Sequence, residues 1–250
     1  MPWLLRSVRW WIGHLLVVAL CITFVNLGFW QLARAEERRL ENEVKAARFG
    51  AEPMALSDLM AGAGNDLDSL ELRQATARGR FQPDHEVLVR SQVNDGVAGF
   101  HVVTPLLLAD DSAVLVNRGW VPLEYDTVPS PAAPPGGEVE VSGWLLQGQQ
   151  ALSAAPSADD DPAIVSTVDI ERLQTDTPWE IAPLYLVSSS GGGEGSFPLA
   201  VSPPDLTDQG PHALYALQWF AFTMTGAAGY VLLLRRALKS HLPPEPAQVP

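Results

Sequence analysis

Two continuous apolar segments stand near the ends of the chain, at residues 10–32 and 213–234. Each is long enough to cross a hydrocarbon layer of about 30 Å as a helix. Trp10 and Trp11 stand at one end of the first segment and Trp30 at the other. Because aromatic rings favour the headgroup level of a bilayer, this pattern predicts two transmembrane helices.

The first apolar segment passes into a charged stretch without a turn. Phe29, Trp30 and Gln31 have the character of an interfacial anchor. Residues 33–49 contain no Gly or Pro, are rich in helix formers, and carry opposite charges at helical spacing. We therefore expect the helix to leave the membrane and to continue as a stalk over residues 33–49.

A cleaved signal peptide is the alternative interpretation of the first segment. Ala33, Arg34 and Ala35 match the small-x-small pattern of a cleavage site, and Arg6 and Arg9 provide a charged region before it. The apolar stretch is longer than the roughly 7–15 residues of a signal peptide, and a bulky Trp-Gln pair precedes the site. An uncleaved anchor is favoured.

The region between the spans has the alternation typical of β-strands. Short stretches rich in Val, Leu and aromatic residues predict strands at residues 74–82, 86–91, 99–108, 113–121, 138–146 and 183–189. Asn94–Gly96 and Ala109–Ser112 suit hairpin turns, and residues 169–174 suit a short helix. The expected fold class is an α+β membrane protein, with two transmembrane helices flanking a compact antiparallel β-rich extracytoplasmic domain of residues 33–212.

Charge is distributed unevenly along the 250 residues, whose formal net charge is −13. Residues 33–212 hold 11 basic and 28 acidic side chains, a net −17, and the flanks together carry a net +4. An acidic centre repels phosphates, which argues strongly against nucleic acid as a partner. Cys21 is the single cysteine, so a disulfide framework and a cysteine-based metal site within the chain are excluded as well.

Basic residues near the spans set the expected orientation. They are Arg6, Arg9, Arg235, Arg236 and Lys239. By the positive-inside rule we expect residues 1–9 and the Pro-rich, disordered tail of residues 235–250 to be cytoplasmic. No Arg- and Ser-rich extension precedes the first span, so the expected location is a bacterial plasma membrane.

The region between the spans offers little catalytic chemistry. His85 and His101 fall in different predicted strands and lack metal-ligand spacing, so packing or surface roles are expected for them. Asp159–Asp161 suits a solvated turn better than a calcium loop. The glycines of residues 188–196 lack the spacing of a phosphate loop, and no nucleophile elbow occurs. We expect neither enzymatic activity nor a bound metal ion.

Two histidines accompany the spans. His14 lies near the inner end of the first and His212 at the outer end of the second, so one haem iron is not expected to bind both. Neutral imidazole is a usual axial haem ligand, and an ionisable group at a membrane boundary is a functional candidate; an interfacial anchor is the alternative for His212. Tyr215 and Trp219 share its helical face, as a ring-stacking surface or a helix–helix contact.

Three motifs carry a resemblance to a known family: LGFWQLARAEER at 27–38, VLVNRGWVP at 114–122 and HALYALQWFAF at 212–222. Their order, their spacing and the two spans make the chain similar to bacterial members of the Surfeit-locus cytochrome c oxidase assembly protein family. Arg38 stands where the family usually has Lys, and the positive charge is kept.

The resemblance implies an assembly factor for haem–copper cytochrome c oxidase that helps haem a to reach subunit I. His212 matches the family's candidate haem a ligand. Subunit I, other oxidase subunits and the lipid bilayer are the implied partners, with haem a synthase as a further candidate.

The other motif residues are expected either to bind a partner or to hold the structure together: Gly28, Trp30, Gln31, Arg34, Arg118, Gly119 and Trp120. Gly119 is expected to permit a turn or a close backbone approach, and Trp120 to fill the domain or to meet the membrane. Arg34 and Arg118 are expected to pair with acids of the chain, the favoured interpretation, or with haem propionates.

Three functions remain in competition. The first is a membrane-bound chaperone of oxidase assembly that binds haem a transiently through His212. The second is a stable, non-catalytic accessory subunit of a respiratory oxidase supercomplex. The third, an extracytoplasmic enzyme or sensor tethered by a helical hairpin, has the least support because catalytic residues are scarce. Haem bound to the purified protein distinguishes the first from the second.

Overall fold

The computed structural model describes residues 7–150, 163–192, 196–208 and 210–239. The chain divides into two compact units, one of residues 1–43 with 207–250 and the other of residues 44–206. We call the first unit the helix pair and the second the β domain. The expected turn at Asp159–Asp161 and the expected tail beyond residue 239 lie outside the described residues.

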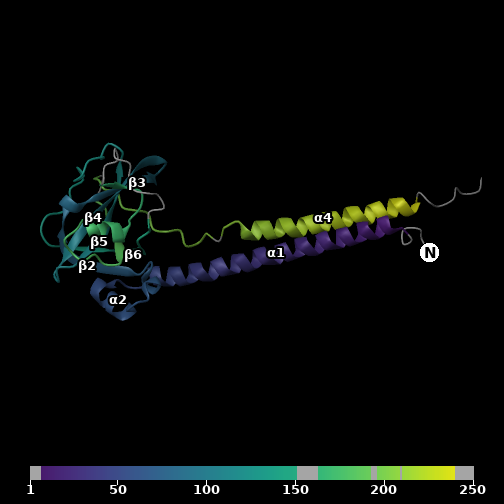
Figure 1. Ribbon diagram of the computed structural model, residues 1–250, viewed down its shortest axis with the longest axis horizontal. Coiled ribbons are helices and arrows are strands. Elements are labelled where there is room, and N and C mark those ends of the chain that lie inside the picture. Colours follow the sequence, from purple (N-terminus) through teal and green to yellow (C-terminus); the bar gives the residue numbers. More distant parts are fainter. Residues whose placement is uncertain (1–6, 151–162, 193–195, 209, 240–250) are drawn as a thin grey trace, which may run out of the picture. The chain divides into compact units, whose positions relative to one another are not determined.

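The helix pair consists of two long apolar helices that lie side by side (Figure 1). Helix α1 runs over Val8–Phe49 and α4 over His212–Lys239. Both are long and apolar enough to cross a membrane. The last residues of α1 belong to the β domain, because the helix continues without a break through the charged stretch. Helix α4 extends five residues past the expected end of the second span.

The two helices meet along a seam of residues spaced three and four apart. On α1 the seam residues, which are less exposed than their neighbours, are His14, Val17, Cys21, Phe24, Gly28, Gln31 and Ala35. This spacing is typical of two helices that wrap around each other at a shallow angle. Gly28 is the buried residue of α1, and a Cβ there would stand only 2.5 Å from the ring of Phe220 on α4. Gly28 therefore permits close helix contact.

Eight strands of the β domain form one sheet among the described residues. The strands are β1 (Met54–Ala55), β2 (Gln74–Phe81), β3 (Val87–Asn94), β4 (Val97–Leu108), β5 (Ala113–Pro122), β6 (Val139–Gln147), β7 (Ile164–Val165) and β8 (Leu184–Ser188). The helices are α2 (Leu56–Ala63) and α3 (Ile170–Thr175), with short 3-10 turns at Leu67–Leu70 and Pro83–His85. The six longer strands and α3 confirm the expected elements within a few residues.

Five of the strands close into a barrel. Their order is β2-β6-β8-β5-β4, and β2 also pairs with β4, which joins the two edges. Inward side chains from all five strands form the largest apolar cluster, and Leu56 and Leu59 of α2 pack against it. Closure satisfies the backbone groups that an open sheet edge would expose.

The expectation of a purely antiparallel sheet is wrong at three places. β1 pairs with β2, β3 with β7, and β5 with β8, each in parallel. β1 and β7 have two residues each, too few to show alternation, and β8 reaches β5 through a long connection rather than a hairpin. Hairpin signals predict only antiparallel pairing between strands that are neighbours in the sequence. The predicted turn between β3 and β4 is confirmed, because Asp95 and Gly96 adopt positive φ there.

Candidate functional site

The NRGW segment of β5 is a β-bulge. Val103 pairs with Asn117 and Val102 with Gly119, so Arg118 is the extra residue with no partner on β4. Gly119 has φ +133°, and a Cβ at this position would overlap the carbonyl of Leu199. This confirms the close backbone approach expected at Gly119. The bulge redirects neighbouring side chains, which is how bulges serve many sites.

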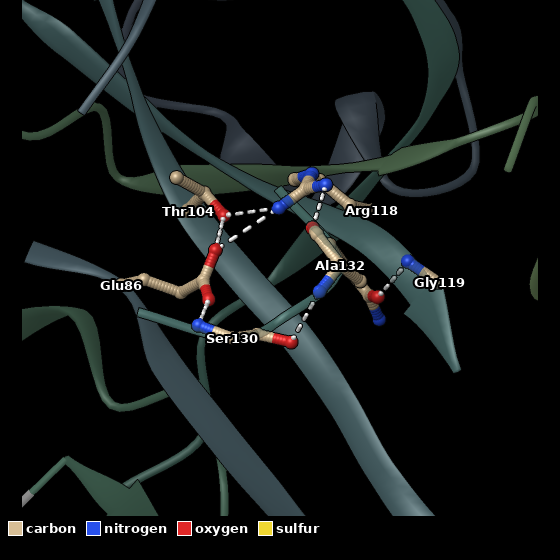
Figure 2. Close-up of polar contacts among 7 residues, drawn as sticks. Glu86, Thr104, Arg118, Gly119, Ser130 and Ala132 are labelled. Atoms are coloured by element: carbon tan, nitrogen blue, oxygen red, sulfur yellow. Dashed lines mark hydrogen bonds and ion pairs between the residues drawn. The ribbon is translucent and has the colours of Figure 1, made fainter. Parts of the chain in front are cut away.

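Arg118 forms a buried ion pair with Glu86 (Figure 2). The Arg118 Nη1 to Glu86 Oε2 distance is 3.0 Å, and the exposed side-chain fractions are 6% and 0%. The Thr104 hydroxyl donates to Glu86 Oε2 at 2.6 Å, and the Ser130 amide donates to Oε1 at 2.7 Å. Arg118 Nη2 donates to the Ala132 carbonyl at 2.5 Å. The pair thus fastens the loop after β5 to the barrel.

Burial dominates the electrostatics of this pair. It raises the pKa of Glu86, against the hydrogen bonds from Thr104 and Ser130 and the charge of Arg118, which lower it. It also lowers the pKa of Arg118, against the attraction of Glu86. Each charge is therefore held by its partner, since a lone charge at this depth would be strongly disfavoured. Salt bridging within the domain, the favoured interpretation for Arg118, is what the structure contains.

Trp120 fills the β domain. Its side chain is buried, packs on Gly99 of β4, and lies 6.1 Å from the ring centre of Phe197. Its backbone exchanges two hydrogen bonds with Leu199, of 2.7 and 2.8 Å. Within the described residues its indole N–H has no hydrogen-bond partner. Packing, rather than a polar contact of the indole, fixes this side chain.

The helix pair joins two motifs that lie far apart in the sequence. The Nδ1 atom of His212, at the start of α4, lies 2.9 Å from Oε1 of Gln31 on α1. An amide oxygen only accepts, so this hydrogen bond requires the proton of His212 to be on Nδ1. In the neutral imidazole the Nε2 atom then keeps the lone pair. A Cβ on Gly210 would stand 3.6 Å from Nε2, so the glycine leaves the space beside that nitrogen open.

The remaining helix-pair candidates differ in exposure. Trp30 is 55% exposed and Tyr215 48% exposed. Trp219 is half-buried and lies 5.4 Å from the ring centre of Phe24, so it makes a helix–helix contact. The Arg34 guanidinium forms an exposed ion pair of 2.7 Å with Glu37, one helical turn away.

The two histidines of the helix pair belong to opposite ends of it. His14 hydrogen-bonds the Tyr230 hydroxyl and contacts the rings of Trp10 and Trp11. His212 instead pairs with Gln31, so the structure does not bring the two together. Across the residues described, no group of three or more His, Cys, Asp or Glu side chains is placed to hold a metal ion.

The sequence pattern missed Glu86 and Thr104 as partners of Arg118. Glu86 stands at the start of a predicted strand beside Val87, where an acid usually faces water. The one available signal was an acid directly before the apolar run of residues 87–89. The pairing of Gln31 with His212 was also missed, since it depends on the register of the two helices.

These features define a class of protein in which a closed β domain stands, along the sequence, between two long apolar helices. The SURF1 family model matches residues 18–224, so the chain belongs to the SURF1 family, as its three motifs predicted. An uncharacterised SURF1-like protein of Mycobacterium bovis is 27% identical over 227 residues, which cover 88% of this chain and 81% of that protein.

Two further relatives extend the comparison. A SURF1-like protein of Rickettsia felis is 23% identical over 229 residues, covering 89% of this chain and 97% of its own length. Surfeit locus protein 1 of Arabidopsis thaliana is 35% identical over 125 residues, covering 46% of this chain and 35% of its own.

Proposed function

We propose that this protein is an assembly factor for a haem–copper cytochrome c oxidase, which holds haem a on its helix pair and assists delivery to subunit I. SURF1 proteins are known generally as oxidase assembly factors, and the chain belongs to that family. The observation that carries the haem part is the 2.9 Å hydrogen bond between Gln31 and His212.

The residues at this end of the helix pair fit a haem. A bound haem would supply an iron that takes an imidazole nitrogen as a ligand. His212 Nε2 is the available nitrogen, because Gln31 holds the proton on Nδ1 and Gly210 places no side chain beside Nε2. A hydrogen bond on the second ring nitrogen fixes the tautomer and raises ligand basicity. His212 is thus the proposed ligand and Gln31 its positioning residue.

Three neighbouring residues complete the proposed site. Tyr215 is exposed on the turn after His212 and offers a ring to the macrocycle, whereas Trp219 positions α4 through Phe24. Arg34 follows Gln31 by one turn, and its exposed ion pair with Glu37 is weak enough to exchange for a propionate. Arg118 is excluded from that role by its burial with Glu86.

The location that we propose is a bacterial plasma membrane, with both chain ends cytoplasmic and the β domain outside. Its support is the two apolar helices and the basic residues near their ends, among them Arg9, Arg235, Arg236 and Lys239. Alkaline phosphatase fused within the loop at Gly136 is expected to be active, and fused after Lys239 inactive. The opposite pattern of phosphatase activities would contradict the proposed topology.

The experiment is the absorption spectrum of detergent-purified protein that is co-expressed with haem a biosynthesis. Wild type is expected to carry a haem a band that His212→Ala loses while keeping its fold. Gln31→Met keeps the length of the side chain without the acceptor, and is expected to weaken haem a affinity about tenfold or more. Asn26→Leu, an exposed change on the same helix, is the matched control and is expected to bind as wild type.

Two outcomes would contradict the haem part of the proposal. Wild type without a band, despite confirmed haem a production, would contradict haem holding; if mature oxidase then co-purifies in equal amount, a stable accessory subunit is the better account. A band that survives His212→Ala would place the iron elsewhere.

A further inference from the structure

The outer face of the barrel carries a second candidate site, independent of the helix pair. A cavity of about 320 Å³ lies over β6, β8, β5 and β4 and is bordered by residues 166–168 and 201–204. All its lining residues belong to the β domain. The volume is at the lower end of small-molecule sites, which are about 300–1,000 Å³, so it suits one ring-sized group.

A relay of hydrogen bonds fixes one donor in this cavity. The amide of Gly119 donates to Asn117 Oδ1 at 3.1 Å, which orients the Asn117 amide group. Asn117 Nδ2 then faces His101 Nδ1 at 3.1 Å. Since Nδ2 only donates, Nδ1 must accept and the His101 proton is on Nε2. The bulge of β5 therefore sets the tautomer of a histidine on the neighbouring strand.

His101 is held neutral as well as oriented. Burial lowers its pKa to about 4, so the imidazole carries a single proton at neutral pH. Among the residues that the structure describes, its Nε2–H meets no hydrogen-bond acceptor. His101 thus presents a fixed donor to whatever enters the cavity.

A second polar group faces the same space. Tyr185 of β8 is half-buried, and burial raises the pKa of its phenol, so the hydroxyl keeps its proton. Its hydroxyl makes no hydrogen bond within the described ranges. Neither this hydroxyl nor His101 Nε2 is a fully buried unpartnered atom, so each can be reached from the cavity.

The rest of the lining decides what kind of ligand fits. Trp144, Leu72, Leu146 and Val187 provide an apolar and aromatic wall. Asp, Glu, Lys and Arg are absent from the lining formed by the described residues, in a chain of net charge −13. A charged ligand would be desolvated here without a counter-charge, whereas an uncharged one loses little.

We propose that this cavity binds an uncharged, ring-sized ligand that carries carbonyl acceptors, the chemistry of a quinone head group. The His101 Nε2–H and the Tyr185 hydroxyl each donate to a carbonyl oxygen, and the Trp144 wall covers the ring. The proposal concerns binding alone and needs no haem.

The test is isothermal titration of the full-length protein in detergent, without haem, using menadione and 2-methylnaphthalene. The two compounds share the fused ring and the methyl group, but only menadione has carbonyls. Menadione is expected to bind one to one, and 2-methylnaphthalene at least tenfold more weakly. Tyr185→Phe removes one hydroxyl and His101→Phe removes one N–H. Each variant is expected to bind menadione about fivefold more weakly than wild type.

Two controls keep the result interpretable. Tyr125→Phe changes a tyrosine that packs on Phe197 outside the lining, and is expected to leave the affinity unchanged. His101→Gln retains a donor and is expected to recover part of the loss. Failure of menadione to bind, equal binding of the two compounds, or wild-type affinity in a folded Tyr185→Phe would each overturn the proposal. Since no haem is present, these outcomes are separate from those for His212.

Discussion

The β domain and the helix pair use their motif residues in opposite ways. In the β domain Arg118 and Trp120 are 6% exposed, and each is enclosed by its own domain. In the helix pair Trp30 remains 55% exposed, and Arg34 forms an exposed ion pair with Glu37 of its own helix. The difference favours a structural role for the NRGW motif, whereas Trp30 and Arg34 of the α1 motif stay exposed, as the proposed function requires.

Removal of Arg118 should give the largest loss of stability. Arg118→Ala leaves the Glu86 carboxylate buried without its counter-charge, which costs about 3–5 kcal/mol of unfolding free energy. Arg78→Ala is the matched control, because Arg78 is 68% exposed in its ion pair with Glu140 and such pairs are worth about 0–1 kcal/mol. Chemical denaturation of the full-length protein measures both. Equal losses of unfolding free energy in the two variants would contradict the structural role of Arg118.

Gly119→Ala should give the second-largest loss of stability. The residue has φ +133°, and the new methyl group would meet the Leu199 carbonyl, so we expect a loss of about 3 kcal/mol. Gly96→Ala separates the two causes, since Gly96 also has positive φ, +80°, but has open space around it. Its expected cost is about 1 kcal/mol. The same denaturation experiment applies, and similar values for both variants would remove the role of the Leu199 contact.

Acid should weaken the β domain through His101. The folded pKa is about 4 and the ordinary value is 6.5, so between these values the unfolded chain binds a proton that the folded chain does not. The free energy of unfolding is therefore expected to fall as pH falls from about 6.5 to about 4. Glu86 acts in the opposite direction, because its raised pKa makes its contribution fall as pH rises above 4.5.

His101→Phe isolates this contribution. The variant is expected to lose the decline between pH 6.5 and 4 while the Glu86 contribution remains. Denaturation midpoints measured across this range for both proteins provide the comparison. An unchanged pH profile in the variant would assign the decline to other groups.

His212→Ala should have the smallest effect on stability. His212 is half-buried at the end of the helix pair, and its side chain hydrogen-bonds Gln31, so the expected change is within about 0.5 kcal/mol. His14→Ala, at the opposite end, is the control because it loses the contact with Tyr230. A large destabilisation by His212→Ala alone would give that residue a structural role instead.

Much of this fold was predictable, and the reason is periodicity. The apolar runs and the alternating strands follow from the repeats of helix and sheet, and the Asn94–Gly96 turn follows from local chemistry. The barrel was not predictable, because the β2–β4 pairing joins residues that are distant in the sequence. Two-residue strands such as β1 are too short for any repeat.

The candidate site residues were likewise predictable only in part. His212 and Gln31 stand in separate motifs, and only the register of two helices brings Nδ1 and Oε1 together. The Glu86 partner of Arg118 depends on a bulge, which no local pattern announces. Motifs thus identified the residues, and the tertiary structure assigned their partners.

The most direct test measures haem a binding on co-expressed preparations and unfolding free energy on haem-free preparations of wild type, His212→Ala and Arg118→Ala, at a temperature where all three are mostly folded. We predict that His212→Ala loses the haem a band and keeps its unfolding free energy, whereas Arg118→Ala keeps the band and loses stability. A folded Arg118→Ala without the band, or a His212→Ala that retains it, would contradict the division between a motif that builds the fold and motifs that bind.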